Sequence, residues 1–474
     1  MFLSSASHAL GVIMIVMISF IGVRFLSYFK SFFFQWHAYR QRDKISTKTL
    51  LELPLPHLKF QITTRGMPGT TEAIMRGIHH IMLLVREAPT LYGQSISIEV
   101  ITESAQQKIE IERAHAACPL PVNVIVLPKC YWTRRGTQLK ARALHFMVEL
   151  RRAGHNAHPY QRCYIVHFDE ESVMEAQEIR NLFFYLARHP HIRLCEGPIY
   201  YPFEYWHTSA ICRAMEANRP IGCFECREVM QKGIPLHLHG SNLVVDERLE
   251  NELGWDIGSL DGQPLIAEDY VFGVNAYLRY GSSIFGWHGC VMLEQPPFSL
   301  KSAFKQRHRW ITGVLQGLVM MRRDPQFDQL PAHIRRRLVW GTSYRIATFA
   351  AGLPAGVVSF CYVLYQAISF IFGGQVESLP FLVALWMIFL GALWLNSIGI
   401  GAYFNLKSMH ESTKAELFFG IVEVLALAPL AGILESSAGF WAVVQWYLGK
   451  RTVHWEPTPK TKIADQFAKT RRHK

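Results

Sequence analysis

The chain has 474 residues, of which 50% are hydrophobic, and it carries a formal net charge of +12. This length predicts two or three domains rather than one soluble domain. The basic excess suits an anionic membrane face, a phosphorylated substrate or nucleic acid. Nine cysteines without a regular spacing exclude a small disulfide-linked scaffold and favour a reducing compartment for the catalytic part.

Apolar residues gather at the two ends of the chain. Residues 9–29 are almost all apolar, and about 20 such residues span a bilayer. The start lacks the positive charge of a signal peptide, whereas basic residues follow from Lys30 onward. The positive-inside rule therefore predicts a transmembrane anchor at 1–30 with its amino terminus outside, followed by a basic juxtamembrane linker at 31–57.

Between residues 58 and 330, short β-rich runs alternate with helical patterns. This alternation predicts an α/β domain with a mostly parallel sheet and helices on both faces. The expected strands are 60–64, 96–102, 122–127 and 164–168, and the expected helices are 71–87, 106–117 and 136–152. Because ligands of such sheets bind beyond the carboxyl ends of the strands, we expect the site there.

The strand expected at 164–168 leads into three consecutive carboxylates, Asp169, Glu170 and Glu171. Adjacent carboxylates repel one another unless a cation lies between them. Asp169 and Glu171 are suited to bind one Mg²⁺ or Mn²⁺ ion, which prefers hard oxygen ligands and is often also bound to substrate phosphates. A solvated acidic turn with a helix N-cap at Ser172 explains this stretch equally well when it is taken alone.

Beyond residue 331 the chain becomes apolar again. Stretches at 338–372, 379–404 and 415–434 are long enough to span a bilayer, whereas 436–448 is shorter and rich in aromatic residues. We expect C-terminal transmembrane helices at 331–449, that is, about three spans plus a re-entrant or interfacial segment. A basic cytoplasmic tail is expected at 450–474.

Two acidic residues, Glu423 and Glu435, lie in or near these apolar stretches. An ionisable group at that depth is costly and often functional. An interfacial Glu435 that meets lipid headgroups or Arg451 is an equally good interpretation.

Four further stretches follow one another between the membrane segments. They are 136–144 with Lys140, 240–242, the Glu268-Asp269 pair, and 306–310 on a basic amphipathic helix. Each has a plain structural explanation, for example Asp269 as a helix cap or Trp310 as an interfacial anchor. Together, in this order and inside an α/β domain, they favour an active site.

The sequence resembles the membrane-integrated, processive-type family 2 glycosyltransferases, a group that includes cellulose, chitin and hyaluronan synthases. Within that group it most resembles the egghead-type β-1,4-mannosyltransferases. The resemblance covers about residues 60–310 and is carried by 62–66, 98–103, 127–144, 165–171, 268–269 and 306–310. It implies a GT-A fold, with a Rossmann-like mixed sheet, for a catalytic domain at 58–330 inserted between transmembrane helices.

The resemblance also implies an inverting, metal-dependent reaction. Asp169 and Glu171 would bind a divalent metal, Mg²⁺ or Mn²⁺, and Asp269 would be the catalytic base that accepts a proton from the acceptor hydroxyl. The residues implied to contact the donor nucleotide or diphosphate are Thr64, Arg65, Glu103, Lys140, Asp169 and Glu170. The residues implied to support the acceptor side are Glu268, Gln306, Arg309, Trp310, Gly240 and Ser241. Many relatives have Asp at the position of Glu103.

The function expected first is transfer of a hexose, mannose from GDP-mannose, from a nucleotide-sugar donor to a lipid-linked or glycan acceptor. The protein would be a multi-pass integral membrane protein, surrounded by membrane lipids, with its catalytic domain facing the cytoplasm. The alternative is a processive β-glycan synthase that uses a UDP-sugar. The motifs do not separate the two functions, because they are expected to contact the diphosphate and the acceptor rather than the hydroxyls of the donor sugar. Three spans are few for a secretion channel, which favours addition of one or a few sugars.

A third possibility is a non-catalytic basic membrane scaffold or a nucleic-acid-binding protein. The sequence has no RNP, KH or zinc-finger pattern, and its basic residues cluster beside the apolar stretches. We therefore expect no nucleic-acid partner. The oligomeric state is left open by the sequence.

Overall fold

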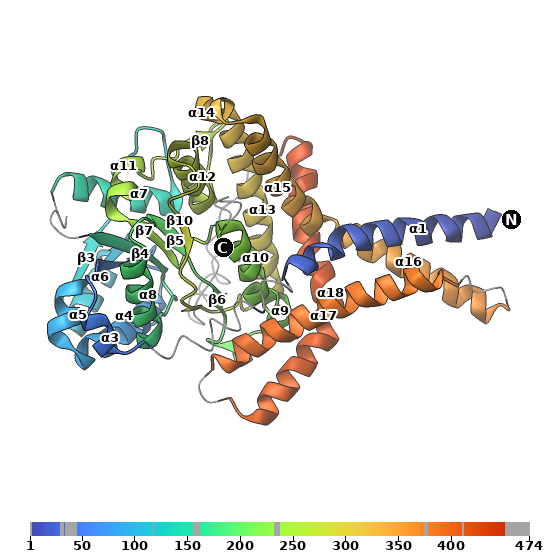
Figure 1. The fold of residues 1–474 in the computed structure, drawn as a ribbon, viewed down its shortest axis with the longest axis horizontal. Helices are drawn as coiled ribbons and strands as arrows, with labels where there is room; N and C mark the ends of the chain where they lie inside the picture. Colours follow the sequence, from blue (N-terminus) through green and yellow to red (C-terminus); the bar gives the residue numbers. More distant parts are fainter. Residues whose placement is uncertain are drawn as a thin grey trace.

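The computed structural model describes residues 2–28, 33, 45–116, 118–154, 162–231, 238–373, 378–409 and 412–450. Two predicted segments lie partly outside the described residues. They are the linker expected at 31–57, of which 31–32 and 34–44 are not described, and the basic tail expected at 450–474, of which 451–474 are not described. Within the described part, an α/β domain stands beside a group of long helices (Figure 1).

The domain is built on a seven-stranded sheet with the order β10-β5-β7-β4-β1-β2-β3. These strands are β1 (His57–Thr63), β2 (Ile96–Thr102), β3 (Val122–Val126), β4 (Cys163–Asp169), β5 (Leu194–Glu196), β7 (Leu243–Asp246) and β10 (Phe285–Trp287). Strands β1 to β4 pair in parallel, whereas β7 runs antiparallel to β4 and β5. The predicted fold class, a mixed α/β sheet between apolar helices, is confirmed.

Two short ribbons lie outside the main sheet. One pairs β6 (Ile199–Tyr200) with β11 (Met292–Leu293), and the other pairs β8 (Ser259–Leu260) with β9 (Gln263–Pro264). The first matters for the site, because β11 ends directly before Glu294.

The helices of the domain connect these strands. They are α3 (Thr47–Leu51), α4 (Thr70–Glu87), α5 (Pro89–Ser95), α6 (Ala105–His115), α7 (Leu139–Arg152), α8 (Ala176–Arg188), α9 (Ala210–Glu216), α10 (Arg219–Gln231), α11 (Glu247–Leu253), α12 (Glu268–Tyr280), α13 (Leu300–Arg323) and α14 (Pro325–Gln329). The helix expected to follow Ser172 begins at Ala176 instead. Ser172 lies in a turn, where its N–H bonds to the carbonyl oxygen of Asp169 at 3.1 Å.

The two faces of the sheet are buried in different ways. Phe60, Val166 and Phe168 belong to an apolar core that α4 and α8 complete. On the opposite face, Lys59 is buried 3.1 Å from Glu247 of α11, and His167 is buried 3.0 Å from Glu250 of the same helix. A one-residue slip of β1 or β4 would exchange these two faces, so the pattern fixes where Asp169 ends its strand.

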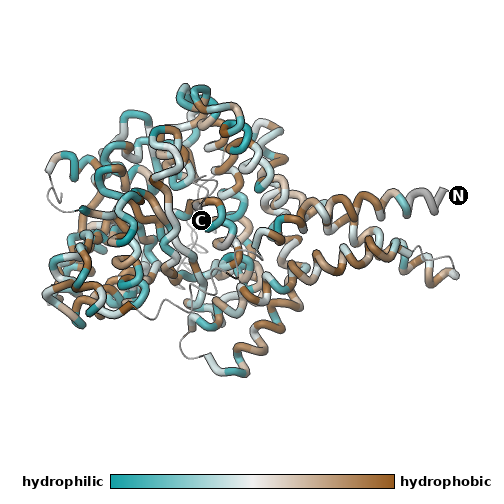
Figure 2. Tube along the Cα trace, viewed as in Figure 1, coloured by the Kyte–Doolittle hydropathy of each residue, from teal (hydrophilic) through white to brown (hydrophobic). Residues whose placement is uncertain are grey.

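Five long helices make up the remainder: α1 (Phe2–Gly22), α15 (Ala332–Ala350), α16 (Gly352–Ile371), α17 (Phe381–Lys407) and α18 (Lys414–Tyr447). In the described part of the chain, four stretches are long and apolar enough to cross a membrane: His8–Tyr28, Ala332–Ile371, Phe381–Lys407 and Lys414–Tyr447. Helices α1 and α16 run side by side away from the sheet, and most of their described residues are hydrophobic (Figures 1 and 2). These features are those of a membrane protein.

The last of these helices is continuous. The short segment expected at 436–448 forms the end of α18, which also contains Pro429. Such a proline is tolerated in apolar helices whose neighbours satisfy the freed backbone group. The number of crossings, and the predicted domain boundaries, stay predictions.

The domain and these long helices are joined by buried contacts. Arg213 of α9 lies 2.6 Å from Glu423 of α18, and the side chain of Asn405 on α17 accepts the N–H of Tyr201 at 2.9 Å. A Cβ at Gly401 of α17 would lie 1.8 Å from the carbonyl oxygen of Ala217. The helices are therefore packed tightly against the domain.

Candidate active site

One cavity of about 380 Å³ lies between the strand ends, α13 and the long apolar helices. It brings together all but one of the predicted site residues: Thr64, Arg65, Glu103, Lys140, Asp169, Glu170, Glu171, Gly240, Ser241, Asp269, Gln306, Arg309 and Trp310. Glu268 does not line it, although its Oε1 lies 3.7 Å from the place that a Cβ on Gly240 would take. Residues up to 246 positions apart in sequence, Thr64 and Trp310, therefore share one site.

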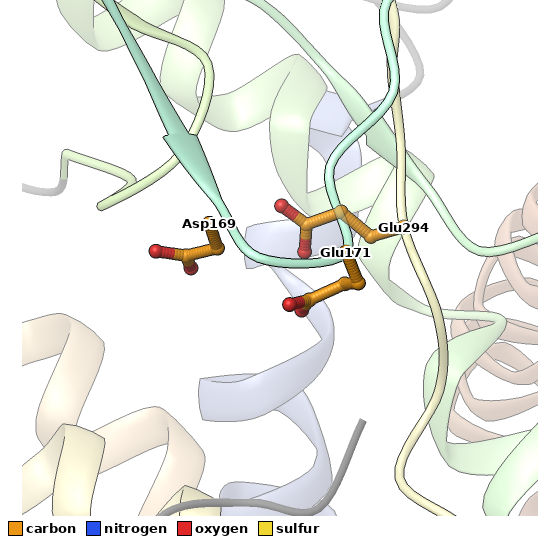
Figure 3. A group of neighbouring side chains, drawn as sticks. All are labelled: Asp169, Glu171 and Glu294. Atoms are coloured by element: carbon orange, nitrogen blue, oxygen red, sulfur yellow. The ribbon is translucent and has the colours of Figure 1, made fainter. Parts of the chain in front are cut away.

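Three carboxylates form a group at the end of β4 (Figure 3). Asp169, Glu171 and Glu294 each offer an oxygen, and these oxygens all lie within 4.8 Å of one another. Glu171 and Glu294 are buried, whereas the side chain of Asp169 is 37% exposed. Three hard oxygen ligands are a donor set that fits Mg²⁺ or Mn²⁺.

Serine hydroxyls hold this group in place. Ser172 accepts the N–H of Asp169 at 3.0 Å and donates to Glu294 at 3.1 Å, and Ser241 also donates to Glu294. Glu294 was not predicted from the sequence. The available signal was an apolar run, residues 291–293, that ends in an acid just as the run before Asp169 does.

Lys140 brings a positive charge to this edge of the sheet. Its ammonium donates to the carboxylate of Asp169 and, at 2.6 Å, to the carbonyl oxygen of Gly240. Burial lowers the pKa of Lys140, but the charges of Asp169 and Glu268 more than offset this, so its pKa lies above the ordinary value. The side chain is therefore a fixed cation at neutral pH.

Gly240 allows the close approach of several polar groups. A Cβ at this position would lie 3.4 Å from both the Lys140 ammonium and Oδ2 of Asp269. A longer side chain here would enter the space between the lysine and the carboxylate.

The ends of β1 and β2 meet beside this group. Glu103 accepts a hydrogen bond from Arg142 at 3.0 Å and lies 3.7 Å from Arg65, while Thr64 donates to Glu170 at 2.7 Å. Glu170 thus points to β1 rather than joining the three carboxylates. Gly66 has φ 70°, and a Cβ there would lie 2.3 Å from Cβ of Ser104, so this turn requires glycine.

Asp269 lies in the first turn of α12. It is not the N-cap, which is Ala267, and its carboxylate accepts the N–H of Tyr270 at 2.8 Å. Burial, followed by the negative charge of Glu268, raises the pKa of Asp269 to about 8. A carboxylate of raised pKa in a cavity is typical of a proton acceptor.

Helix α13 supplies Gln306, Arg309 and Trp310 to the cavity. Burial lowers the pKa of Arg309, while the charges of Glu268 and Asp169 act in the opposite direction. Two guanidinium groups lie against the ring of Trp310, that of Arg219 at 4.0 Å and that of Arg307 at 4.7 Å. Trp310 was predicted to support the acceptor side, so an acceptor sugar stacked on its ring would compete with these arginines.

Arg307 was not predicted as part of the site. It is fully buried, lies 2.5 Å from Glu216 and 3.4 Å from Glu435, and donates to Oε1 of Gln306 at 2.5 Å. Because Glu435 belongs to α18, this arginine connects the cavity to the long apolar helices. Glu435, one of the two acidic residues found in or near the apolar stretches, is therefore paired with an arginine.

The cavity also reaches residues of the apolar stretches that were not predicted from the sequence. Arg24 and Tyr28 come from the end of the first apolar stretch, and Arg345 and Phe349 come from α15. The available signal was an arginine inside an otherwise apolar stretch, which is rare without a function.

The chain is similar to known glycosyltransferases. Residues 164–396 match the family model described as "Glycosyl transferase family group 2". This match covers just under half of the chain and supports a glycosyltransferase. The β-1,4-mannosyltransferase egh of Drosophila melanogaster is 27% identical over 228 residues, which are 47% of this chain and 45% of the relative. The β-1,4-mannosyltransferase bre-3 of Caenorhabditis elegans is 25% identical over 285 residues, 59% of this chain and 56% of the relative.

The predicted resemblance to egghead-type β-1,4-mannosyltransferases of family 2 is confirmed by these matches. The chain spans about half the length of the curated relatives it matches. Among solved structures, mannosyltransferase PcManGT from Pyrobaculum calidifontis, in complex with GDP-Man and Mn²⁺, is 14% identical, with a TM-score of 0.42 over 88% of this chain and 99% of that chain. A likeness of this strength does not place individual residues.

Proposed function

We propose that the protein transfers a hexose, mannose from GDP-mannose, to a hydroxyl of a lipid-linked acceptor and forms a β-glycosidic bond. The observation that carries this proposal is one cavity lined both by Lys140 and the carboxylates at the strand ends and by side chains of the long apolar helices. A nucleotide sugar comes from water and a lipid-linked sugar from the membrane, so such a cavity suits both substrates. The names of the curated relatives support mannose as the sugar.

The donor is assigned to the strand ends. Asp169, Glu171 and Glu294 would hold the divalent ion, which when bound offsets the negative charge of the donor diphosphate. Lys140 adds a fixed positive charge beside the same group. The residues that line the nucleotide end are Thr64, Arg65, Glu103 and Glu170.

The chemistry is assigned to Asp269. Its carboxylate accepts the proton of the acceptor hydroxyl while that oxygen attacks the anomeric carbon, and the bond from this carbon to the donor diphosphate breaks with inversion. Efficient bases have pKa values near the working pH, which agrees with the raised pKa of Asp269. Glu268 adjusts that pKa through its charge, and Gln306, Arg309 and Trp310 border the acceptor.

The orientation is assigned from charge. Lys407 and Lys414 flank the turn between α17 and α18, which the positive-inside rule places in the cytoplasm together with the α/β domain. A cytoplasmic domain would meet cytoplasmic nucleotide sugars directly.

A donor panel tests the function. Purified protein in detergent is incubated with Mn²⁺, a lipid extract and, in turn, GDP-mannose, UDP-glucose and UDP-N-acetylglucosamine, and the released nucleotide is identified. Release of GDP that depends on the lipid extract is expected. Release of UDP with a long polymeric product would support a processive β-glycan synthase instead, and no release with any donor would exclude glycosyl transfer.

A further inference from the structure

Two arginines from different apolar stretches share one carboxylate in the cavity wall. Arg24, from the end of the first apolar stretch, donates to Glu225 of α10 at 2.5 Å, and Arg345 of α15 lies 3.2 Å from the same carboxylate. Tyr28 donates to it at 3.3 Å. Both arginine side chains are 15% exposed and both line the cavity. Two positive charges here meet one negative charge.

Neighbouring groups do not cancel the excess. Arg219 and Arg307 lie nearby in the cavity wall, but they are matched one to one by Glu216 and Glu435. Glu196 is a further acid that lies close enough for Arg345 to affect its pKa. Burial raises the pKa of Glu196 to about 8, so this carboxyl is mostly neutral at pH 7. The Arg24–Arg345–Glu225 cluster therefore keeps a net positive charge.

Arg345 also has an unused donor. Within the described part of the chain, its Nη1 is buried and has no hydrogen-bond partner. Buried donors are nearly always paired, and leaving one unpaired lowers stability. An anionic group that enters the cavity would satisfy this nitrogen and the excess charge together.

The cluster lines the same cavity as the proposed base, and one contact connects the two. The hydroxyl of Tyr270, the residue after Asp269, lies 3.1 Å from Oγ1 of Thr342 on α15. Thr342 and Arg345 are three residues apart and therefore on one face of that helix. Ile346 and Phe349 continue the lining of the same cavity with apolar surface.

We propose that Arg24 and Arg345 bind the phosphate that links the acceptor sugar to its lipid. The acceptor would then be a sugar carried on a lipid phosphate or diphosphate rather than a neutral glycolipid. The planar guanidinium groups match phosphate oxygens, and Ile346 and Phe349 offer an apolar wall to the first carbons of the lipid. This inference rests on the proposed function and specifies its acceptor.

Binding can be tested without catalysis. The full-length protein in detergent is heated with a polyprenyl phosphate, with the polyprenol of the same length, and with inorganic phosphate. Only the first is expected to raise the melting temperature, and Arg345→Gln should abolish the rise. Arg336→Gln, an exposed arginine on the same helix, is the matched control and should keep it. An equal rise with the polyprenol would overturn recognition of phosphate, and an equal rise with inorganic phosphate would overturn the lipid as its source.

Turnover separates this inference from the proposed function. Two acceptors are compared that carry the same sugar on the same lipid, one through a phosphate and one through a direct glycosidic bond. The wild type should prefer the phosphate-linked acceptor, and Arg345→Gln should reduce kcat/KM for it on the order of tenfold while changing the other little. Equal use of both acceptors by the wild type overturns the phosphate site but leaves glycosyl transfer standing. Transfer to neither acceptor with any donor contradicts the proposed function itself.

Discussion

The ammonium group of Lys140 contacts the carboxylate of Asp169, and the same group donates to the carbonyl oxygen of Gly240 at 2.6 Å. Lys140 comes from the start of α7 and Asp169 from the end of β4, so the contact joins a helix to a strand end. The proposed metal site includes that strand end. Asp169 thus has two partners to satisfy, the lysine and the proposed ion. Removing its charge should affect both.

We expect Asp169→Asn to abolish metal-dependent binding of the donor and to leave the fold intact, because the residue is partly exposed at the end of its strand. Titration of nucleoside diphosphate with and without Mn²⁺ measures this, and the melting temperature serves as the fold control. Asp328→Asn is the matched control, because Asp328 is exposed and does not line the cavity. Wild-type turnover in Asp169→Asn, or activity that survives exhaustive chelation, would show the metal assignment to be wrong.

Glu294 gives a second test of the metal site. Neutralising Glu294 should weaken the affinity for Mn²⁺ on the order of tenfold, because a carboxylate ligand is replaced by a weaker amide oxygen. Glu294→Gln keeps the size of the side chain and an acceptor for Ser172 and Ser241. An Mn²⁺ requirement identical to that of the wild type would remove Glu294 from the ligand set.

Asp269 separates binding from chemistry. Positioned proton transfer contributes roughly 10²–10⁴-fold to a rate, so Asp269→Asn should lower turnover on the order of 10² or more and spare the affinity for the donor. If Asp269 only stabilised the start of α12, its loss would cost about 1 kcal/mol of stability and leave turnover nearly intact. Turnover, donor affinity and melting temperature of the variant, measured together, decide between the two. A destabilised but fully active variant would contradict the proposed base.

The pH dependence follows from the same residue. Asp269 must be ionised to accept a proton, so kcat/KM should rise as the pH increases through its pKa of about 8. Glu268 contributes to that raised pKa through its negative charge, so Glu268→Gln should lower the pKa and move the rise to lower pH. The pH profile of kcat/KM for both proteins checks this. A shift of the variant to higher pH would mean that another group governs the rise.

The topology predicts which positions can be labelled. Single cysteines near Ser5 and Gly373 should react with a membrane-impermeant reagent added from outside, whereas a cysteine near Lys407 should react only after permeabilisation. A cysteine at Lys460 is also expected to be protected, although that position lies outside the described residues. Labelling at Lys407 from outside would reverse the orientation or change the number of spans.

The strands and the residues at their ends were predictable because their signals are local. Each of the first four strands is a short β-rich run, and the residues at its end, such as Glu103 and Asp169, reach the same edge of a parallel sheet. The sequence could not show that Glu294 joins Asp169 and Glu171. That contact depends on the pairing of β11 with β6. These two strands have two residues each and are too short to show any periodicity.

The membrane side of the cavity was less predictable for a different reason. Residues 209–231 form α9 and α10, and Cys212 and Met215 of α9 pack against α17 and α18 rather than against the sheet. A helix buried between two other helices has no clear polar face, so its pattern does not indicate its partners. The overall hydropathy of the apolar stretches does not indicate Arg24 and Arg345, although each is the single Lys, Arg, Asp or Glu residue of its stretch, 9–29 and 338–372.

The ion pairs of Arg307 have a consequence for whether the α/β domain of this protein can be separated from its apolar helices. This guanidinium, from the helix that borders the cavity, is neutralised in part by Glu435 of α18, and Arg213 of α9 depends in the same way on Glu423. A fragment that ended before residue 331 would keep the arginines and lose both acids, and a buried charge that loses its partner is strongly destabilising. The α/β domain is therefore not a detachable module. A recombination event, or a protein engineer, that exchanges this domain between two related proteins must bring along the helices that carry the matching acids.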